Sequence, residues 1–236
     1  MKQEQFAYSS VKGLLHQQKG IVNQDACIAK KYKFGTVLVV ADGMGSHRYS
    51  EIGSRAACKA VCDAVQKWQQ YEDMDIRLLI PLLHAIWNLE IYPYPKKECG
   101  TTCLFAYISN EDKLYVAQLG DGNIYISIDD EITLFHSKED EFSNFTSGLS
   151  NISSLDEWSI REYDIKNKRI SLMLMTDGVS ETLMEDKKEA FVSLLWKRVN
   201  EADNLVKRNN LIYSILQNWN VINAGDDRTI VCYRKI

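Results

Sequence analysis

Short apolar runs and helical repeats alternate along the first third of the chain. Residues 34–41 form a β-branched apolar run of the kind that makes a buried strand, and the run stops at an Asp-Gly pair. From Ser50 to Trp68, apolar residues recur at three- and four-residue steps, which predicts a helix with one buried face. A second helical pattern spans residues 76–91, with Pro81 near its first turn. We therefore expect a strand followed by two helices.

The middle of the chain changes to a strand-like period. Strands are expected at residues 101–108, 113–119 and 123–127. The segments between them, residues 109–112 and 120–122, are rich in turn-forming residues. The pattern therefore predicts a meander of hairpins.

The last third mixes polar and periodic stretches. Residues 137–164 are polar without a sustained period, which is typical of a surface flap. A strand is expected at residues 169–176, two helices within residues 187–219, and a closing strand at residues 228–233. This order predicts an α+β layered domain with mostly antiparallel sheets. Because no repeat or low-complexity linker divides the chain, residues 1–236 are expected to form one domain.

Composition narrows the classes of partner. The formal net charge of -4 gives no basic field, so nucleic acid and anionic membranes are not expected as main partners. Nowhere do about 18 apolar residues run together, and the N-terminal segment lacks the apolar core of a signal peptide. The six cysteines form no CxxC pair and are expected to be buried free thiols. The expected compartment is therefore the reducing cytoplasm.

Four aspartates share one local setting, beside glycine where an apolar strand meets its loop. They are Asp42, Asp121, Asp177 and Asp226. Asp and Gly are common turn residues, so any one of these sites alone is explained by its turn. Four carboxylates converging from separate strands would repel unless a cation neutralised them, and oxygen ligands suit Mg²⁺ or Mn²⁺. A metal pair of this kind can polarise a phosphoryl oxygen and activate water.

Six short segments occur in a fixed order from the start of the chain to its end. They are Asn23-Gln24-Asp25, Asp42-Gly43-Met44-Gly45-Ser46-His47, Gly100-Thr101-Thr102, Gly120-Asp121-Gly122-Asn123, Thr176-Asp177-Gly178-Val179 and Gly225-Asp226-Asp227-Arg228-Thr229. In this order and spacing, the set resembles the metal-dependent (type 2C, or PPM) serine/threonine protein phosphatases, in a divergent bacterial-type branch. The resemblance implies a four-layer α-β-β-α sandwich of two mostly antiparallel sheets flanked by helix pairs. It places the metals in a cleft at one end of the sheets.

The resemblance also implies roles for particular residues. Asp42 would bridge two metal ions, and Gly43 would give its backbone carbonyl to one of them. Asp177 and Asp226 would complete the protein ligands of the first ion. Asp25 would support the site by hydrogen-bonding metal-bound water or a neighbouring ligand. The implied reaction is direct attack of metal-activated water on phosphoserine or phosphothreonine, without a covalent enzyme intermediate.

The number of ions, two or three, stays open at this point. Asp121 matches the position that binds a third ion in bacterial members of the family. Asp140, in the acidic run at residues 139–141, is a further candidate ligand. A run of acids is also typical of a solvated face.

Several positions depart from the family pattern. Gly20 stands where many members have a phosphate-binding arginine, and the adjacent Lys19 cannot supply the bidentate fork of a guanidinium. Gln24 replaces a common glutamate, and Asn123 replaces a common arginine. Met44 stands where animal members of the family have a histidine, and bacterial members usually have methionine at this position. These departures concern substrate grip and metal affinity rather than the fold.

Two histidines and one arginine complete the candidates. His47 is a candidate catalytic residue, as a proton donor or a phosphate contact, and a structural role at the start of the following helix is the alternative. His16 either touches the site or is a core histidine satisfied by backbone. Arg228 either pairs with Asp226 or meets phosphate.

Two functions follow. The first is a Mg²⁺- or Mn²⁺-dependent phosphatase acting on a phosphoprotein made by a serine/threonine kinase, which the presence of all the acidic ligands favours. The second is a catalytically weak pseudophosphatase that serves as a phosphoprotein-binding or regulatory module, because Gly20, Gln24 and Asn123 weaken the usual substrate and metal shell.

Overall fold

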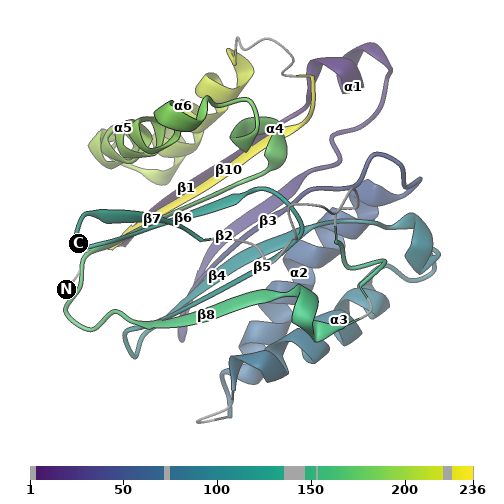
Figure 1. Cartoon of the computed structure of the whole chain (residues 1–236), viewed down its shortest axis with the longest axis horizontal. Helices are drawn as coiled ribbons and strands as arrows, with labels where there is room; N and C mark the ends of the chain where they lie inside the picture. Colours follow the sequence, from purple (N-terminus) through teal and green to yellow (C-terminus); the bar gives the residue numbers. More distant parts are fainter. Residues whose placement is uncertain (1–3, 72–74, 136–146, 153, 220–224, 236) are drawn as a thin grey trace.

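Two five-stranded antiparallel sheets face each other, and a pair of helices covers the outer side of each sheet (Figure 1). The computed structural model describes residues 4–71, 75–135, 147–152, 154–219 and 225–235. The order of layers is helices, sheet, sheet, helices. The α+β sandwich that the sequence predicted is therefore confirmed.

The sheets combine strands from distant parts of the chain. The first sheet contains, in spatial order, β1 (Glu4–Val11), β10 (Arg228–Lys235), β9 (Ile170–Met175), β6 (Asn123–Ile128) and β7 (Glu131–Phe135). The second contains β2 (Ala26–Tyr32), β3 (Gly35–Ala41), β4 (Cys103–Ser109), β5 (Lys113–Leu119) and β8 (Ser159–Asp164). The N-terminal strand β1 thus pairs with the C-terminal strand β10.

Each helix pair packs on one sheet. The helices α2 (Ser50–Trp68) and α3 (Leu79–Glu90) lie on the second sheet, while α5 (Lys188–Glu201) and α6 (Leu205–Gln217) lie on the first (Figure 1). Two shorter helices, α1 (Leu14–Gln18) and α4 (Asp177–Ser180), lie in connecting segments. None of the helices in the described part of the chain combines the length and the apolar character that a bilayer crossing requires.

The apolar core follows the layers. Every residue of β3 and β4 is buried, because one face of these central strands packs on the other sheet and the other face packs on α2 and α3. A strand buried on both faces has a continuous apolar run instead of an alternating pattern. The buried face of α2 carries small side chains, including Ala57, Ala60 and Ala64, which let the helix axis approach the sheet closely.

The predicted meander is correct for its first turn and wrong for its second. Strands β4 and β5 form an antiparallel hairpin, but β5 and β6 belong to different sheets. The Gly120–Gly122 segment is therefore a crossover. Gly120 and Gly122 have φ values of 86° and 91°, and a Cβ atom at either position would lie within 2.7 Å of a backbone carbonyl oxygen. Asp121 is consequently held at the point where the chain passes from the second sheet to the first.

The predicted surface flap is wrong at its C-terminal end. A short 3-10 turn (Leu155–Glu157) leads into β8, which pairs with β5 at the edge of the second sheet. Edge strands expose part of their length, so β8 contains polar residues such as Arg161 and Glu162 and lacks a strong apolar signal. Asp140 lies outside the described residues.

Candidate active site

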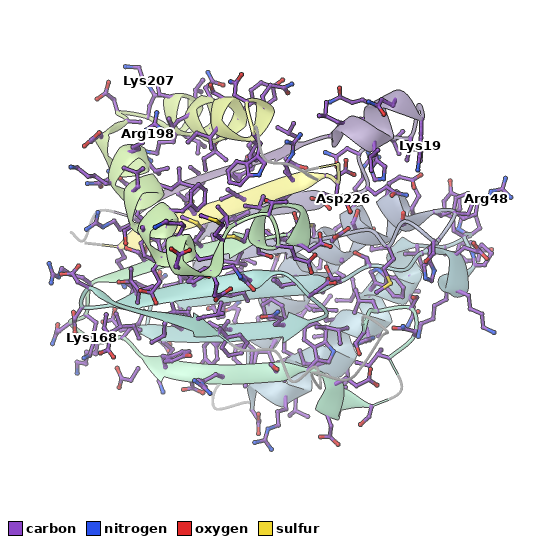
Figure 2. All side chains as sticks on the ribbon, turned by 45° about the horizontal axis from the view of Figure 1, so that its top comes forward. Lys19, Arg48, Lys168, Arg198, Lys207 and Asp226 are labelled. Atoms are coloured by element: carbon purple, nitrogen blue, oxygen red, sulfur yellow. The ribbon has the colours of Figure 1, made fainter. Side chains whose placement is uncertain are left out.

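Five aspartates reach one end of the sandwich because each stands at the end of a strand. Asp42 follows β3, Asp177 follows β9, and Asp121 lies in the crossover from β5 to β6. Asp25 directly precedes β2, and Asp226 lies two residues before β10. The antiparallel register brings the ends together, since Ala26 of β2 pairs with Ala41 of β3. Figure 2 shows Asp226 at the same end of the molecule as α1 and the β3–α2 loop.

Four of these aspartates line one pocket of about 340 Å³. Its lining comprises His16, Gln24, Asp42, Gly43, Met44, Gly45, Ser46, His47, Thr102, Asp121, Asn151, Asp177 and Asp226. One carboxylate oxygen from each of Asp42, Asp121 and Asp177 lies within 4.8 Å of the others. This spacing suits a cation held by oxygen ligands.

Without a cation, burial and mutual repulsion disfavour the ionised form of these carboxyl groups. Burial raises the pKa of Asp42 well above its ordinary value, and the charges of Asp25 and Asp177 add to the rise. Burial likewise raises the pKa of Asp177 to about 6, with further contributions from Asp121 and Asp226. A divalent ion bound among these oxygens would reverse the effect, because it favours the ionised carboxylates. The donor set therefore fits Mg²⁺ or Mn²⁺.

Asp25 lies behind the pocket instead of lining it. Its Oδ2 accepts hydrogen bonds from the hydroxyls of Thr176 (2.9 Å) and Thr229 (2.7 Å). Its Oδ1 is buried and has no hydrogen-bond partner in the described part of the chain. Burial raises the pKa of Asp25 to about 8, although the Thr229 hydroxyl acts against the rise. This geometry suits a group that supports its neighbours more than one that binds an ion directly.

The Gly-Thr-Thr segment before β4 fixes Asp42. The Thr101 hydroxyl donates to the backbone carbonyl of Asp42 (2.8 Å), and the Thr102 hydroxyl accepts from the backbone N–H of Asp42 (2.9 Å). The Thr102 backbone N–H also donates to the Asp42 carbonyl (2.9 Å). A Cβ atom at Gly43 would lie 2.6 Å from the Gln24 carbonyl oxygen, so glycine is required for this close packing. The motif around Thr101 thus positions the carboxylate.

Asp227 is a site residue that sequence reasoning missed, although the Asp-Asp pair before β10 contains it. Its Oδ1 accepts from the backbone N–H of Gly13 (2.7 Å), and its Oδ2 accepts from that of Gln24 (2.6 Å). The Nδ1 atom of His16 lies 2.9 Å from the same Oδ2. Buried Asp227 therefore fastens both ends of the segment that carries α1 to the loop that carries Asp226.

The remaining candidates lie in different settings. His47 lines the pocket, and its Nδ1 is 2.6 Å from the Lys97 carbonyl oxygen. Arg228 is buried and donates to the Trp219 carbonyl (3.5 Å). Within the described residues it forms no ion pair with Asp226 and does not line the pocket, so both roles that we expected for it are wrong.

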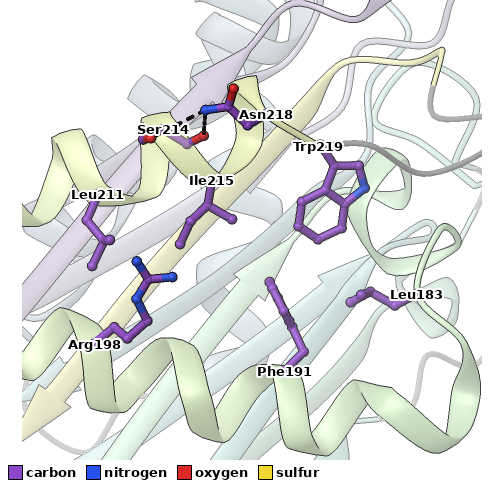
Figure 3. A pocket seen from close by; sticks show the side chains of 8 residues that line it. All are labelled: Leu183, Phe191, Arg198, Leu211, Ser214, Ile215, Asn218 and Trp219. Carbon is purple, nitrogen blue, oxygen red and sulfur yellow. Dashed lines mark hydrogen bonds between the residues drawn. The ribbon is translucent and has the colours of Figure 1, made fainter.

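A larger hollow of about 450 Å³ lies between α5 and α6 (Figure 3). Its lining is mostly apolar and consists of Leu183, Phe191, Arg198, Leu211, Ser214, Ile215, Asn218 and Trp219. No carboxylate is among them. This hollow therefore lacks the acidic ligands that line the pocket at the strand ends.

A four-layer sandwich with carboxylates gathered at one end of its sheets is the architecture of a metal-dependent phosphatase. The family model described as protein phosphatase 2C matches residues 12–212, and the chain belongs to this family. No curated protein sequence matches the chain.

Solved structures share the fold across nearly the whole chain. The catalytic domain of the serine threonine protein phosphatase PstP, in complex with two manganese ions, is 18% identical with a TM-score of 0.65, and the match covers 100% of both chains. PppA, a key regulatory component of the T6SS in Pseudomonas aeruginosa, is 17% identical with a TM-score of 0.68, covering 99% of this chain and 98% of that one. RsbX in complex with magnesium is 15% identical with a TM-score of 0.58, covering 100% of both.

Proposed function

We propose that this protein is a Mn²⁺- or Mg²⁺-dependent protein serine/threonine phosphatase. The observation that carries the proposal is the set of carboxylate oxygens from Asp42, Asp121 and Asp177 within 4.8 Å of one another, in a pocket that also contains Asp226. Membership of the protein phosphatase 2C family supports it. The bound manganese of PstP and the bound magnesium of RsbX support the choice of metal.

The chain's own residues divide the work of binding. Asp42, Asp177, Asp226 and the Gly43 carbonyl would hold two ions, and Asp121 would contribute to a third. Bound divalent ions supply an activated water and neutralise phosphoryl charge. Asp25, restrained by two threonine hydroxyls, would accept a hydrogen bond from a ligand or water.

His47 is our proposed proton donor to the serine or threonine oxygen that leaves. It lines the pocket, and a Cβ atom at Gly100 would lie 2.7 Å from its ring, so the ring packs flat on that glycine. The Lys97 carbonyl accepts at Nδ1, which leaves Nε2 for a substrate. To donate a proton from Nε2 while Nδ1 donates to the Lys97 carbonyl, the ring would act as an imidazolium, in which both nitrogens are donors.

The proposed substrate is a phosphoprotein made by a serine/threonine kinase, and the proposed compartment is the cytoplasm. The six cysteines are free thiols, which supports a reducing environment. Phosphorylated serine and threonine side chains project from a protein surface, and the Asp226 side of the pocket is exposed enough to receive one.

A phosphoprotein-binding module without turnover is the second candidate. The Gln24 amide donates to the Ser50 hydroxyl (2.6 Å) and supplies no charge, and Gly20 supplies no side chain for phosphate. Metal binding would be weaker with one carboxylate fewer.

Phosphate release from a panel of phosphoserine and phosphothreonine peptides separates the two candidates. The enzyme should release phosphate with Mn²⁺, stop with EDTA, and lose at least about 100-fold in kcat as Asp177→Asn, the scale of removing one strong electrostatic contributor. Turnover that survives EDTA and Asp177→Asn would exclude the metal mechanism. Peptide binding without turnover at millimolar Mn²⁺ would favour the binding module.

A further inference from the structure

We propose that His16, held by Asp227, contacts the phosphoryl group of the substrate. The proposal rests on the proposed function, since it concerns the same pocket. His16 comes from α1, a different element from those that carry Asp42, Asp177 and Asp226.

The position of His16 is set by its surroundings. The residue lines the pocket, and its side chain is only 15% exposed. One of its ring nitrogens lies within 4.8 Å of carboxylate oxygens of both Asp226 and Asp227. A Cβ atom at Gly13 would lie 2.3 Å from the Asp226 backbone, so the segment leading into α1 packs tightly on the loop beside the pocket. The imidazole therefore stands at the rim of the carboxylate cluster.

Asp227 determines which ring nitrogen of His16 can contact a ligand. Its carboxylate accepts two backbone N–H groups and is 2% exposed, so it cannot move to suit a substrate. The Nδ1 atom of His16 lies 2.9 Å from Asp227 Oδ2. Two lone pairs at this distance would repel, so we assign a proton to Nδ1; the approach is a charge contact that lacks the alignment of a hydrogen bond. Nε2 is then the ring nitrogen left for a ligand.

A phosphoryl oxygen is the ligand that this arrangement suits. With phosphate at Nε2, the ring lies between two anionic acceptors and donates to each, as an imidazolium does. Asp227 balances the ring's charge with a full negative charge. At His47, the partner of Nδ1 is only a backbone carbonyl.

Few side chains of the described structure could supply a positive charge to the phosphoryl group. His16 and His47 are the only described pocket-lining residues that can carry a positive charge. Lys19 is exposed at the end of the same helix and lies outside that lining (Figure 2). Arg228 is engaged with the Trp219 carbonyl. Gly20 has no side chain to offer.

Two substitutions separate phosphate contact from structural support. In His16→Asn the amide nitrogen is bonded to Cγ, as Nδ1 is, so the Asp227 contact is kept and Nε2 is lost. In His16→Gln the amide nitrogen extends to the level of Nε2, so a donor to phosphate is kept and the Asp227 contact is lost. Lys19→Gln is the matched control, because it removes a charge from the same helix outside the pocket.

The measurements are the affinity of the Mn²⁺-loaded protein for inorganic phosphate, by calorimetry, and its affinity for Mn²⁺ alone. His16→Asn should weaken phosphate binding about 10- to 100-fold, the range for a hydrogen bond to a charged group. His16→Gln should lose less than His16→Asn. Lys19→Gln should match the wild type, and Mn²⁺ affinity should stay unchanged in all three.

A double-mutant cycle with Asp227→Asn tests the coupling. Asparagine keeps only one of the two oxygens that accept the Gly13 and Gln24 backbone N–H groups, so Asp227→Asn should weaken phosphate binding in both backgrounds. The loss should be larger in the wild-type background than in His16→Asn, and the difference is the coupling between Asp227 and His16. Wild-type phosphate affinity in His16→Asn would overturn the proposal. So would a loss of Mn²⁺ affinity in His16→Asn, which would make His16 a metal ligand, or a larger loss in His16→Gln than in His16→Asn, which would make it a structural partner of Asp227.

These outcomes are independent of turnover. If the wild type bound phosphate but released none from phosphopeptides, the proposed enzymatic function would fail while the His16 comparison stayed valid. If turnover were Mn²⁺-dependent but His16→Asn bound phosphate normally, only the His16 proposal would fail.

Discussion

Replacing Asp177 by asparagine should stabilise the metal-free protein and remove its response to Mn²⁺. The Oδ1 of Asp177 accepts the backbone N–H of Gly178 (2.6 Å), and asparagine keeps this acceptor. The substitution therefore removes a charge and leaves the turn intact. If Asp177 is a metal ligand, the substitution should raise the Tm in EDTA and remove the response to Mn²⁺. If Asp177 is only a turn residue, the substitution should do neither.

The size of the effect follows from the pKa of Asp177. Its carboxyl has a pKa raised from 3.8 to about 6, chiefly by burial. A raised carboxyl pKa means that the folded state binds the proton more tightly than the unfolded state, so stability is lost as pH rises from 3.8 and the loss is complete above about 6. At 1.36 kcal/mol per pKa unit, the loss is about 3 kcal/mol. Asp177→Asn should recover about 1–3 kcal/mol of it at pH 8.

Thermal unfolding in EDTA at pH 5 and pH 8 measures this gain. A change of 1 kcal/mol moves the Tm of a domain this size by about 2–4 °C, so Asp177→Asn should unfold about 2–12 °C higher at pH 8, with a smaller gain at pH 5. Saturating Mn²⁺ should raise the Tm of the wild type and not that of the variant.

The matched control is Asp164→Asn. The exposed Asp164 accepts the backbone N–H of Lys166 (2.9 Å) at the far end of β8, so its replacement should change neither the Tm nor the Mn²⁺ response. The reasoning is refuted if Asp177→Asn lowers the Tm in EDTA at pH 8 and keeps the wild-type response to Mn²⁺. Asp177 would then be a turn residue only.

Two further substitutions separate the site from the core. Gly13→Ala places a Cβ atom 2.3 Å from the backbone of Asp226, so it should displace that loop, destabilise the protein by about 1–3 kcal/mol and weaken Mn²⁺ binding; unchanged calorimetric Mn²⁺ affinity would contradict this. Trp87→Phe removes a buried Nε1–H that donates to the Gly53 carbonyl (3.0 Å), so urea unfolding should show a loss of about 1–3 kcal/mol while the KM and kcat for a phosphopeptide stay the same. A change in KM without a loss of stability would show that the core and the pocket are coupled in a way that the fold does not explain.

Local patterns predicted the central elements of the fold well. The apolar run ending at Asp42 is β3, and the helical repeat from Ser50 to Trp68 is α2. The helical repeat predicts α2 correctly because one face of this helix packs on a sheet. The continuous apolar run predicts β3 correctly because this strand is buried on both faces. Strands near the edges were missed, since β7 and β8 expose much of their length and their patterns are weak.

Local sequence patterns could not predict contacts between distant parts of the chain. The turn at Gly120 has the composition of a hairpin, but whether the chain returns to the same sheet or crosses to the other depends on how the sheets pack. The aspartates at strand ends were found because each has a local signal beside glycine. The contact of Asp227 with His16 was not, because it joins residues more than 200 positions apart.

Anomalous diffraction from a crystal grown with Mn²⁺ tests the central claim most directly. We expect manganese peaks beside the carboxylates of Asp42, Asp177 and Asp226 in the wild type. In Asp42→Asn these peaks should be weak or absent. A wild-type pocket without manganese at saturating Mn²⁺, or peaks that are unchanged in Asp42→Asn, would contradict a carboxylate-bound metal centre.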